Sequence, residues 1–198
     1  MNKVKFKGTT LYRKRVVNNI LDVYNNDTFE FNLDWYKLAS LWAQEIADQY
    51  DVDYLQVCGV VAAFSPLKNW QENKRIAELY ISTGVSKHTK RCTDKARVIL
   101  ADSRSEEFIL ATLNGNKIQN FFLNLAFPTR KDPVTIDRHA VSICAGKSLT
   151  NKHYTGITDN LYSFFKSCFI DASDIAGIRP SLMQSITWEK WRELKKLN

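Results

Sequence analysis

The sequence has 198 residues, is 44% hydrophobic and holds only seven glycines and four prolines, which excludes a disordered chain and a turn-rich all-β protein. No apolar run is long enough to span a membrane or to follow the basic first residues as a secretory signal would. The formal net charge of +7 suits a phosphate backbone, so charge alone leaves a nucleic-acid-binding protein and a merely basic protein equally open.

Helical spacing of apolar residues dominates the first half of the chain. It predicts helices over residues 9–25, 33–50 and 70–81, and Gly84 ends the last of these. Residues 54–64 are apolar nearly all round, and their length and alanine content favour a buried helix over a strand.

The second half continues in helices, so the chain is predicted to be all-α. A short polar loop of three residues, Asn114-Gly115-Asn116, separates two of these helices, and Asp137 begins another. The last helix has Pro180 in its first turn, where the missing N–H costs nothing. In chain order, the expected helices cover residues 89–102, 104–112, the stretch up to 127, the stretch after 137, 157–169 and the stretch after 180.

The four cysteines bear on metal binding and on the setting of the protein. Cys58, Cys92, Cys144 and Cys168 lie far apart and form no CxxC pair, so we expect no zinc site, no iron–sulfur cluster and no other cofactor. Unpaired thiols suit a reducing compartment. We therefore expect a cytoplasmic protein, associated with the nucleoid if its source is a bacterium or a phage. We also expect a monomer.

The stretch LNGNKIQNFFLNLAF, residues 113–127, contains a short glycine-containing loop that runs into an apolar helix. The first amide N–H groups of such a helix have no partner within it, and its dipole is positive at this end. Both features favour an anion, and a DNA phosphate is one candidate. The first charged residue of the helix is Lys117, which is either an ordinary solvated lysine or one directed at a substrate.

The same stretch resembles the helix–hairpin–helix DNA glycosylases, the group that includes endonuclease III. Those proteins carry L-P-G-V-G-x-K-x-x-N, an apolar helix ending in A-F, and then V-D-x-H; this chain has L-N-G-N-K-I-Q-N, F-F-L-N-L-A-F and I-D-R-H. Residues 60–80, VVAAFSPLKNWQENKRIAELY, are similar to the first barrel-lobe helix of the family, its loop and the next helix. The hairpin is two residues shorter here, has Asn114 in place of the proline, and is not followed by the cysteine quartet of endonuclease III.

The resemblance implies a two-lobed helical fold and a catalytic pair. Residues 53–137 would form a barrel-like lobe that ends in the hairpin, and residues 1–52 with 138–198 would form the second lobe. Lys117 and Asp137 match the positions of the family's nucleophile and carboxylate. Removing a base builds positive charge at C1′, and a nearby carboxylate either stabilises this charge or activates a nucleophile. An amine that attacks C1′ forms a Schiff base that permits strand cleavage by β-elimination.

The partner implied by the resemblance is double-stranded DNA with one nucleotide flipped out, and no membrane is involved. The hairpin, the basic segment 86–97 and one histidine are expected to contact DNA; the candidates are Asn114, Gly115, Asn116, Lys87, Lys90, Arg91 and His139. The loop after the first barrel helix is expected to line the base pocket or to act as a wedge in the DNA; the candidates are Ser65, Asn69 and Trp70.

The expected function is base excision by a DNA glycosylase, in DNA repair or in attack on modified DNA, and the sequence leaves open whether the enzyme is also an abasic-site lyase. Two other interpretations remain open. Asp137 can be a plain helix N-cap and Lys117 a phosphate contact, in a non-catalytic helix–hairpin–helix DNA-binding or accessory protein. The positive charge would also suit a helical RNA-binding protein.

Overall fold

The structure of the chain, a computed structural model, describes every residue except 29, 31–33, 103–104, 150–156 and 197–198. The described part is mostly helical, which confirms the expected class, and it divides into two compact units. Unit 1 comprises Met1–Tyr36 and Thr129–Asn198, and unit 2 comprises Lys37–Pro128. Among the described helices, none is long and apolar enough to cross a membrane.

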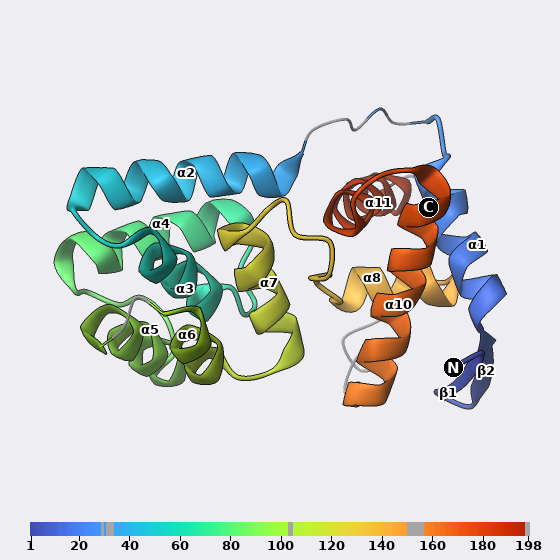
Figure 1. Cartoon of the computed structure of the whole chain (residues 1–198), viewed down its shortest axis with the longest axis horizontal. Helices are drawn as coiled ribbons and strands as arrows, with labels where there is room; N and C mark the ends of the chain where they lie inside the picture. Colours follow the sequence, from blue (N-terminus) through green and yellow to red (C-terminus); the bar gives the residue numbers. More distant parts are fainter. Residues whose placement is uncertain (29, 31–33, 103–104, 150–156, 197–198) are drawn as a thin grey trace. The chain divides into compact units, whose positions relative to one another are not determined.

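Unit 2 is built around one central helix, α3 (Tyr54–Phe64), as Figure 1 shows. Asp53 caps the start of α3, because its carboxylate accepts hydrogen bonds from the N–H groups of Leu55 (2.9 Å) and Gln56 (3.3 Å). Every residue from Gln56 to Phe64 is buried, as the apolar run predicted. The helices that pack on α3 are α4 (Trp70–Thr83), α5 (Lys90–Asp102), α6 (Glu106–Leu113) and α7 (Asn116–Ala126).

Helix α2 (Trp35–Tyr50) is joined to α3 and α7 by the hydroxyl group of Tyr54. This hydroxyl donates to the backbone oxygen of Leu125 (2.9 Å) and lies 2.7 Å from the Ser40 hydroxyl. Since a phenol has one proton, Ser40 must be the donor in the second bond. Most of α2 therefore belongs to the unit that holds α7.

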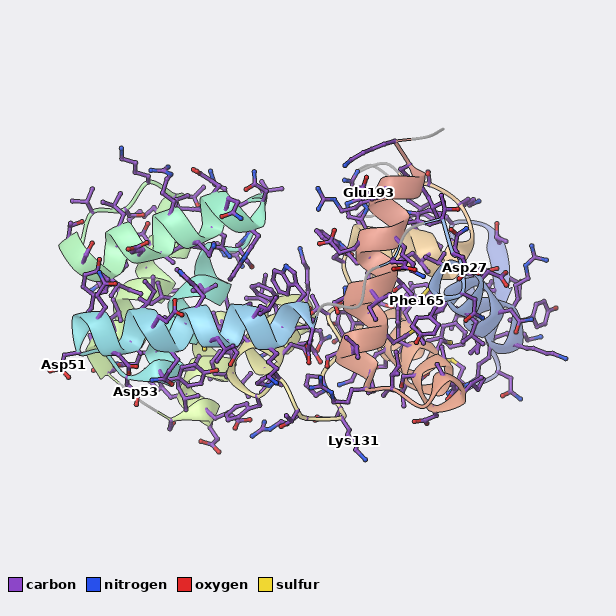
Figure 2. All side chains as sticks on the ribbon, turned by 90° about the horizontal axis from the view of Figure 1, so that it is seen from above. Asp27, Asp51, Asp53, Lys131, Phe165 and Glu193 are labelled. Atoms are coloured by element: carbon purple, nitrogen blue, oxygen red, sulfur yellow. The ribbon has the colours of Figure 1, made fainter. Side chains whose placement is uncertain are left out.

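Unit 1 packs the remaining described helices on a second core: α1 (Arg13–Tyr24), α8 (Arg138–Ala145), α10 (Asp159–Ala176) and α11 (Pro180–Leu194). Phe165 of α10 is fully buried in this core (Figure 2). Pro180 opens α11 in the first-turn position that the sequence predicted. Near the end of α11, the Lys190 ammonium donates to the backbone oxygens of Tyr24 (2.6 Å) and Asn26 (2.8 Å), and so closes the end of α1.

The helix predicted over residues 9–25 begins four residues later than expected, because a short β ribbon precedes it. Strands β1 (Lys3–Phe6) and β2 (Thr9–Tyr12) pair antiparallel, and helix α1 begins at Arg13 rather than at residue 9. The strands form because apolar and polar side chains alternate along them: Phe6 and Leu11 are buried, while Lys3 and Lys5 are exposed. The ribbon is held by the core of unit 1, where Phe6 meets Phe165 edge to face, with ring centroids 5.8 Å apart.

The borders of the two units differ from those of the predicted lobes. Unit 2 starts at Lys37 rather than at residue 53, because α2 packs with it. It ends at Pro128 rather than at residue 137, because Val134 and Ile136 are fully buried in the core of unit 1. Asp137 therefore belongs to unit 1.

Candidate functional site

In unit 2, α6 and α7 are joined by a tight hairpin at Asn114-Gly115. Both residues have positive φ angles, 53° for Asn114 and 93° for Gly115; glycine adopts such angles freely, whereas they are uncommon for asparagine. Helix α7 then begins at Asn116, and the N–H groups of Ile118 and Gln119 bond to the Gly115 carbonyl. The predicted helix–loop–helix is therefore confirmed, with an exposed turn at Asn114-Gly115 and a half-buried Asn116.

Lys117 is the second residue of α7 and is half-buried. It lies in the first turn, where amide N–H groups point out of the helix end. Across the part of the chain that the structure describes, no hydrogen bond or ion pair engages its ammonium group. The amine is thus available to a ligand.

Lys95 of α5 braces the hairpin from behind. Its ammonium group donates to the backbone oxygen of Leu113, the last residue of α6, where the negative end of the helix dipole favours a cation. Burial lowers the pKa of Lys95, and repulsion from Arg91 adds to the effect. Lys95 therefore serves the hairpin and is not displayed for a phosphate.

The other cations of segment 86–97 differ in how freely they are presented. Lys87 and Arg91 are exposed, while Lys90 is exposed but ion-paired with Asp94 one turn later (2.7 Å). DNA contacts at these three cations stay predictions. Lys90 would have to leave its ion pair to make one.

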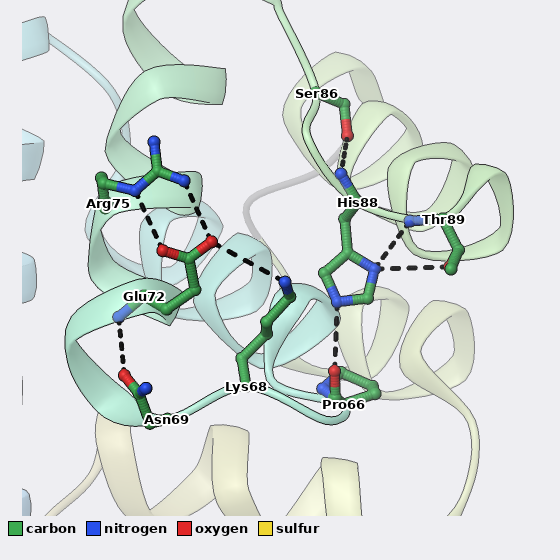
Figure 3. A network of polar contacts seen from close by, with 8 residues as sticks. All are labelled: Pro66, Lys68, Asn69, Glu72, Arg75, Ser86, His88 and Thr89. Carbon is green, nitrogen blue, oxygen red and sulfur yellow. Dashed lines mark hydrogen bonds and ion pairs between the residues drawn. The ribbon is translucent and has the colours of Figure 1, made fainter.

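The loop between α3 and α4, residues 65–69, is fixed by His88 (Figure 3). The Nδ1 atom of His88 accepts the N–H of Thr89 (2.8 Å), so Nε2 carries the proton and donates to the Pro66 carbonyl (3.1 Å). The imidazole also stacks on the buried ring of Phe64, with centroids 5.8 Å apart. Sequence reasoning had no signal for this brace, because His88 lies 22 residues from Pro66.

The far end of the same loop is fixed by Asn69, which caps α4 by accepting the N–H of Glu72 (2.9 Å). Glu72 in turn pairs with Arg75 (2.9 Å) and lies 3.7 Å from the Lys68 ammonium. Figure 3 draws both contacts. At the start of the loop, the Ser65 hydroxyl donates to the Ala62 carbonyl (2.9 Å). Ser65 and Asn69 thus have local structural roles, and their part in a base pocket stays a prediction.

Trp70, the third predicted pocket residue, packs edge to face on Trp42 of α2, with centroids 5.6 Å apart. The Lys74 ammonium lies 5.6 Å from the centroid of each ring, a favourable cation–π position. Trp70 is half-buried, so packing accounts for it without a base. Its role in base binding stays a prediction.

Leu67 is the residue of this loop that sequence reasoning missed. Its side chain is 99% exposed, and its φ of 61° is rare for any residue other than glycine. The bonds on either side of it, at Pro66 and Asn69, hold the loop in this conformation. An exposed apolar side chain on a fixed loop has the form of a wedge that can enter a stack of bases. The available signal was a lone apolar residue in a polar loop.

In unit 1, Asp137 is the N-cap of α8: its Oδ1 accepts the N–H of Ala140 (2.8 Å). Its Oδ2 accepts the indole N–H of Trp188 (2.9 Å), which comes from α11. The N-cap role considered from the sequence is therefore correct. Each oxygen of the Asp137 carboxylate keeps a second lone pair, so the carboxylate can still interact with a bound ligand.

His139 lies next to this carboxylate, with its ring edge to face on Trp188 and the centroids 5.8 Å apart. Its Nδ1 is buried and has no hydrogen-bond partner among the described residues. Burial lowers the pKa of His139, nearby cations lower it further and Asp137 opposes them; the cations are Arg138, Lys195 and Arg192. A DNA contact by His139, which stays a prediction, would thus be made by the neutral ring.

The candidate residues therefore form separate groups. The hairpin with Lys117, the loop with Leu67 and the segment 86–97 belong to unit 2, while Asp137, His139 and Trp188 gather in unit 1. Within the described residues, no three His, Cys, Asp or Glu side chains are grouped to hold a metal ion. All four cysteines are buried and unpaired.

Fold and sites together define a mostly helical protein with two helices joined by a tight turn in one unit and an aspartate held by an indole in the other. The chain belongs to the Family of unknown function (DUF7178), whose model matches residues 2–195 and so takes in both units. No curated protein and no solved structure matches the chain significantly.

Proposed function

We propose that the protein is a DNA glycosylase and abasic-site lyase with a helix–hairpin–helix glycosylase-like fold. The observation that carries the proposal is Lys117, an available amine in the first turn of α7 directly after the Asn114-Gly115 hairpin. The resemblance of this stretch and of I-D-R-H to the glycosylases supplies the reaction and adds Asp137.

In the proposed reaction, the amine of Lys117 attacks C1′ while the bond from C1′ to the base breaks, and the departing base takes up a proton. The Asp137 carboxylate stabilises the positive charge that develops on the sugar. The sugar ring then opens to give a Schiff base between its C1′ and the lysine. Loss of a proton from C2′ expels the 3′ phosphate and cuts the strand.

Leu67 supports the same proposal from another element of unit 2. Flipping a nucleotide costs a few kcal/mol of unstacking and unpairing. A leucine that enters the gap restores part of the lost stacking, and apolar wedges act in this way on other DNA. The exposure of the Leu67 side chain, which is 99%, suits this role.

Borohydride trapping tests the role of Lys117. A Schiff base to the sugar is reduced by borohydride, so wild-type protein with an abasic-site duplex should give a covalent complex. Lys117→Gln should bind the duplex and give none, while Lys131→Gln, which changes an exposed lysine of unit 1, should trap like wild type. Trapping by Lys117→Gln at the wild-type level would assign the chemistry to another amine.

A second candidate function is a non-catalytic helix–hairpin–helix DNA-binding protein. The observation in its favour is that both oxygens of Asp137 already accept a hydrogen bond within unit 1. A panel of duplexes, each with one damaged or modified base, separates the two functions. DNA binding without base release, nicking or trapping on any duplex would establish the non-catalytic function.

A further inference from the structure

One face of the β1–β2 ribbon in unit 1 displays lysines beside an aromatic ring. In the register of the ribbon, Lys3 lies opposite Tyr12 and Lys5 opposite Thr10. All four residues are exposed, because alternation sends Phe6 and Leu11 into the core instead. The Tyr12 side chain is among the exposed large hydrophobic groups of the described residues, at 58%.

The ribbon presents this face on a fixed support. A two-stranded ribbon is marginal in isolation, but Phe6 packs on Phe165 of α10 and so anchors this one. The two turn residues, Lys7 and Gly8, both have positive φ, as the tightest hairpin turn requires. The Arg13 N–H donates to the Asn2 carbonyl (2.8 Å) and ties the open end of the ribbon.

The charge of this region is strongly positive. Residues 1–15 contain six cations and no acid: Lys3, Lys5, Lys7, Arg13, Lys14 and Arg15. Arg13 is committed to Asp171 of α10 through bonds of 2.6 and 2.7 Å and to the Ser167 hydroxyl (2.9 Å). Lys3, Lys5 and Lys14 are exposed.

Tyr12 also lines an open hollow of about 700 Å³ beside the ribbon. Lys14, Asn18, Asp174 and Ile175 form other parts of its wall, and Ile175 is 68% exposed. Two cations, Arg13 and Lys14, balance two acids, Asp171 and Asp174, so the lining carries no net formal charge. A flat, polar-edged group suits this hollow better than a phosphate does.

We propose that this face binds an unpaired strand of nucleic acid, with phosphates at Lys3 and Lys5 and a base stacked on Tyr12 over the hollow. Proteins that bind single strands combine a row of cations along the phosphate backbone with aromatic side chains on which bases stack. The ribbon supplies both on one face, through Lys3, Lys5 and Tyr12. The proposal does not require the Lys117 chemistry, since all of its residues lie in unit 1.

The aromatic ring decides between this partner and other anions. An acidic protein surface would use the lysines but has no base to stack on Tyr12, and a base-paired duplex has its bases already stacked. Affinity for an unpaired strand should therefore depend on both kinds of residue. Affinity for another polyanion should depend on the lysines alone.

The test is binding of a fluorescent thymidine oligonucleotide of about 12 nucleotides, a length within the range of single-strand sites. A backbone of the same length without bases, a duplex and polyglutamate serve as comparison probes. Tyr12→Ala should weaken thymidine binding roughly 5-fold or more and leave the base-free backbone unchanged, while Tyr12→Phe should retain affinity. The double variant Lys3→Gln with Lys5→Gln should weaken binding of both the thymidine oligonucleotide and the base-free backbone. It should also lower the salt slope of thymidine binding by about 1.4.

The matched control is Lys131→Gln with Lys147→Gln, which removes the same charge from exposed positions of the same unit. Equal losses of thymidine affinity in the control and ribbon lysine variants would overturn the proposal. Unchanged thymidine affinity in Tyr12→Ala would also overturn it, as would a Tyr12→Ala variant that loses as much affinity for polyglutamate as for thymidine. Each variant is checked by its thermal unfolding midpoint. Repeating the series on the Lys117→Gln background should give the same differences, so a failed lyase assay and a failed ribbon assay are told apart.

Discussion

The two units present their candidate residues in opposite ways. In unit 2, Lys117 and Leu67 are displayed: among the described residues no polar partner engages the lysine, and the leucine is almost fully exposed. In unit 1, Asp137 is held by a helix N-terminus and by Trp188. Groups that enter or attack a ligand have to be free to do so, whereas a carboxylate that stabilises charge works best when its direction is fixed beforehand.

The largest effect should come from removing the charge of the fixed carboxylate. Asp137→Asn keeps a good N-cap, so stability should change little, but base release should fall at least 10²-fold, the range seen when one electrostatic stabiliser is lost. Asp137→Ala should add a loss of about 1 kcal/mol in the free energy of unfolding. Single-turnover excision and urea unfolding measure the two effects. Full activity in folded Asp137→Asn would remove unit 1 from the chemistry.

Truncating Leu67 should lower activity and leave the free energy of unfolding unchanged. Leu67→Ala should slow excision on a duplex about tenfold, because the wedge offsets part of the few kcal/mol that unstacking costs. The free energy of unfolding should stay within about 0.5 kcal/mol, since the side chain is 99% exposed. Leu38→Ala, at an exposed leucine of α2, is the control. A rate equal to wild type would take Leu67 out of the DNA.

The cations of segment 86–97 sharpen the contrast between displayed and engaged groups within one short segment. Lys87→Gln and Arg91→Gln should each reduce the salt slope of duplex binding by about one unit if each contacts a phosphate. Lys90→Gln should change it less, because Lys90 is paired with Asp94. The slopes come from titrations between low and moderate salt. Three equal slopes, all at the wild-type value, would place the segment away from DNA.

A smaller effect should follow when the orienting donor is removed and the carboxylate is kept. Trp188→Phe retains the ring but deletes the indole N–H that bonds to Asp137, so stability should fall by about 1 kcal/mol. Excision should slow while duplex affinity stays constant, since the change affects how the carboxylate points. Trp191→Phe is the matched control on α11, because Trp191 Nε1 has no hydrogen-bond partner among the described residues. Equal effects of the two variants would argue that packing alone is at work.

The smallest effect should be a pH dependence centred on His139. Its pKa is lowered in the folded state by burial and by Arg138, Arg192 and Lys195, against the attraction of Asp137. A lowered pKa means that folding favours the neutral ring, so stability is present above the unfolded value of 6.5 and is lost as pH falls below it. The loss between pH 7.5 and about 5 should be smaller in His139→Gln, as read from urea midpoints. Identical dependences of the urea midpoint on pH in wild type and His139→Gln would contradict a role of His139 in this loss of stability.

Much of the helical framework could be predicted, because apolar spacing reports packing locally. The buried run 54–64 coincides with α3, and Gly84 ends α4 as expected, with a φ of 71°. The ribbon was missed because each strand has only four residues and the alternation of Lys3 to Phe6 is easily read as a basic tail. The turn residue Gly8, after Lys7, was the signal that could have revealed it.

The candidate sites could be predicted only where the chemistry is contiguous in sequence. The Asn114–Lys117 hairpin is such a case. The exposure of Leu67 depends on a histidine 22 residues from Pro66, and the direction of Asp137 depends on an indole 51 residues away. Such contacts are set by tertiary packing, so residue type and spacing carry no trace of them.

The closure of α1 by Lys190 has a consequence for the order of synthesis. The carbonyls of Tyr24 and Asn26 leave the ribosome early, but the ammonium group that binds them follows more than 160 residues later. All of unit 2 is translated in between, as one continuous segment that can fold as soon as it emerges. The nascent chain can therefore complete the hairpin between α6 and α7 before Lys190 is available to close the end of α1.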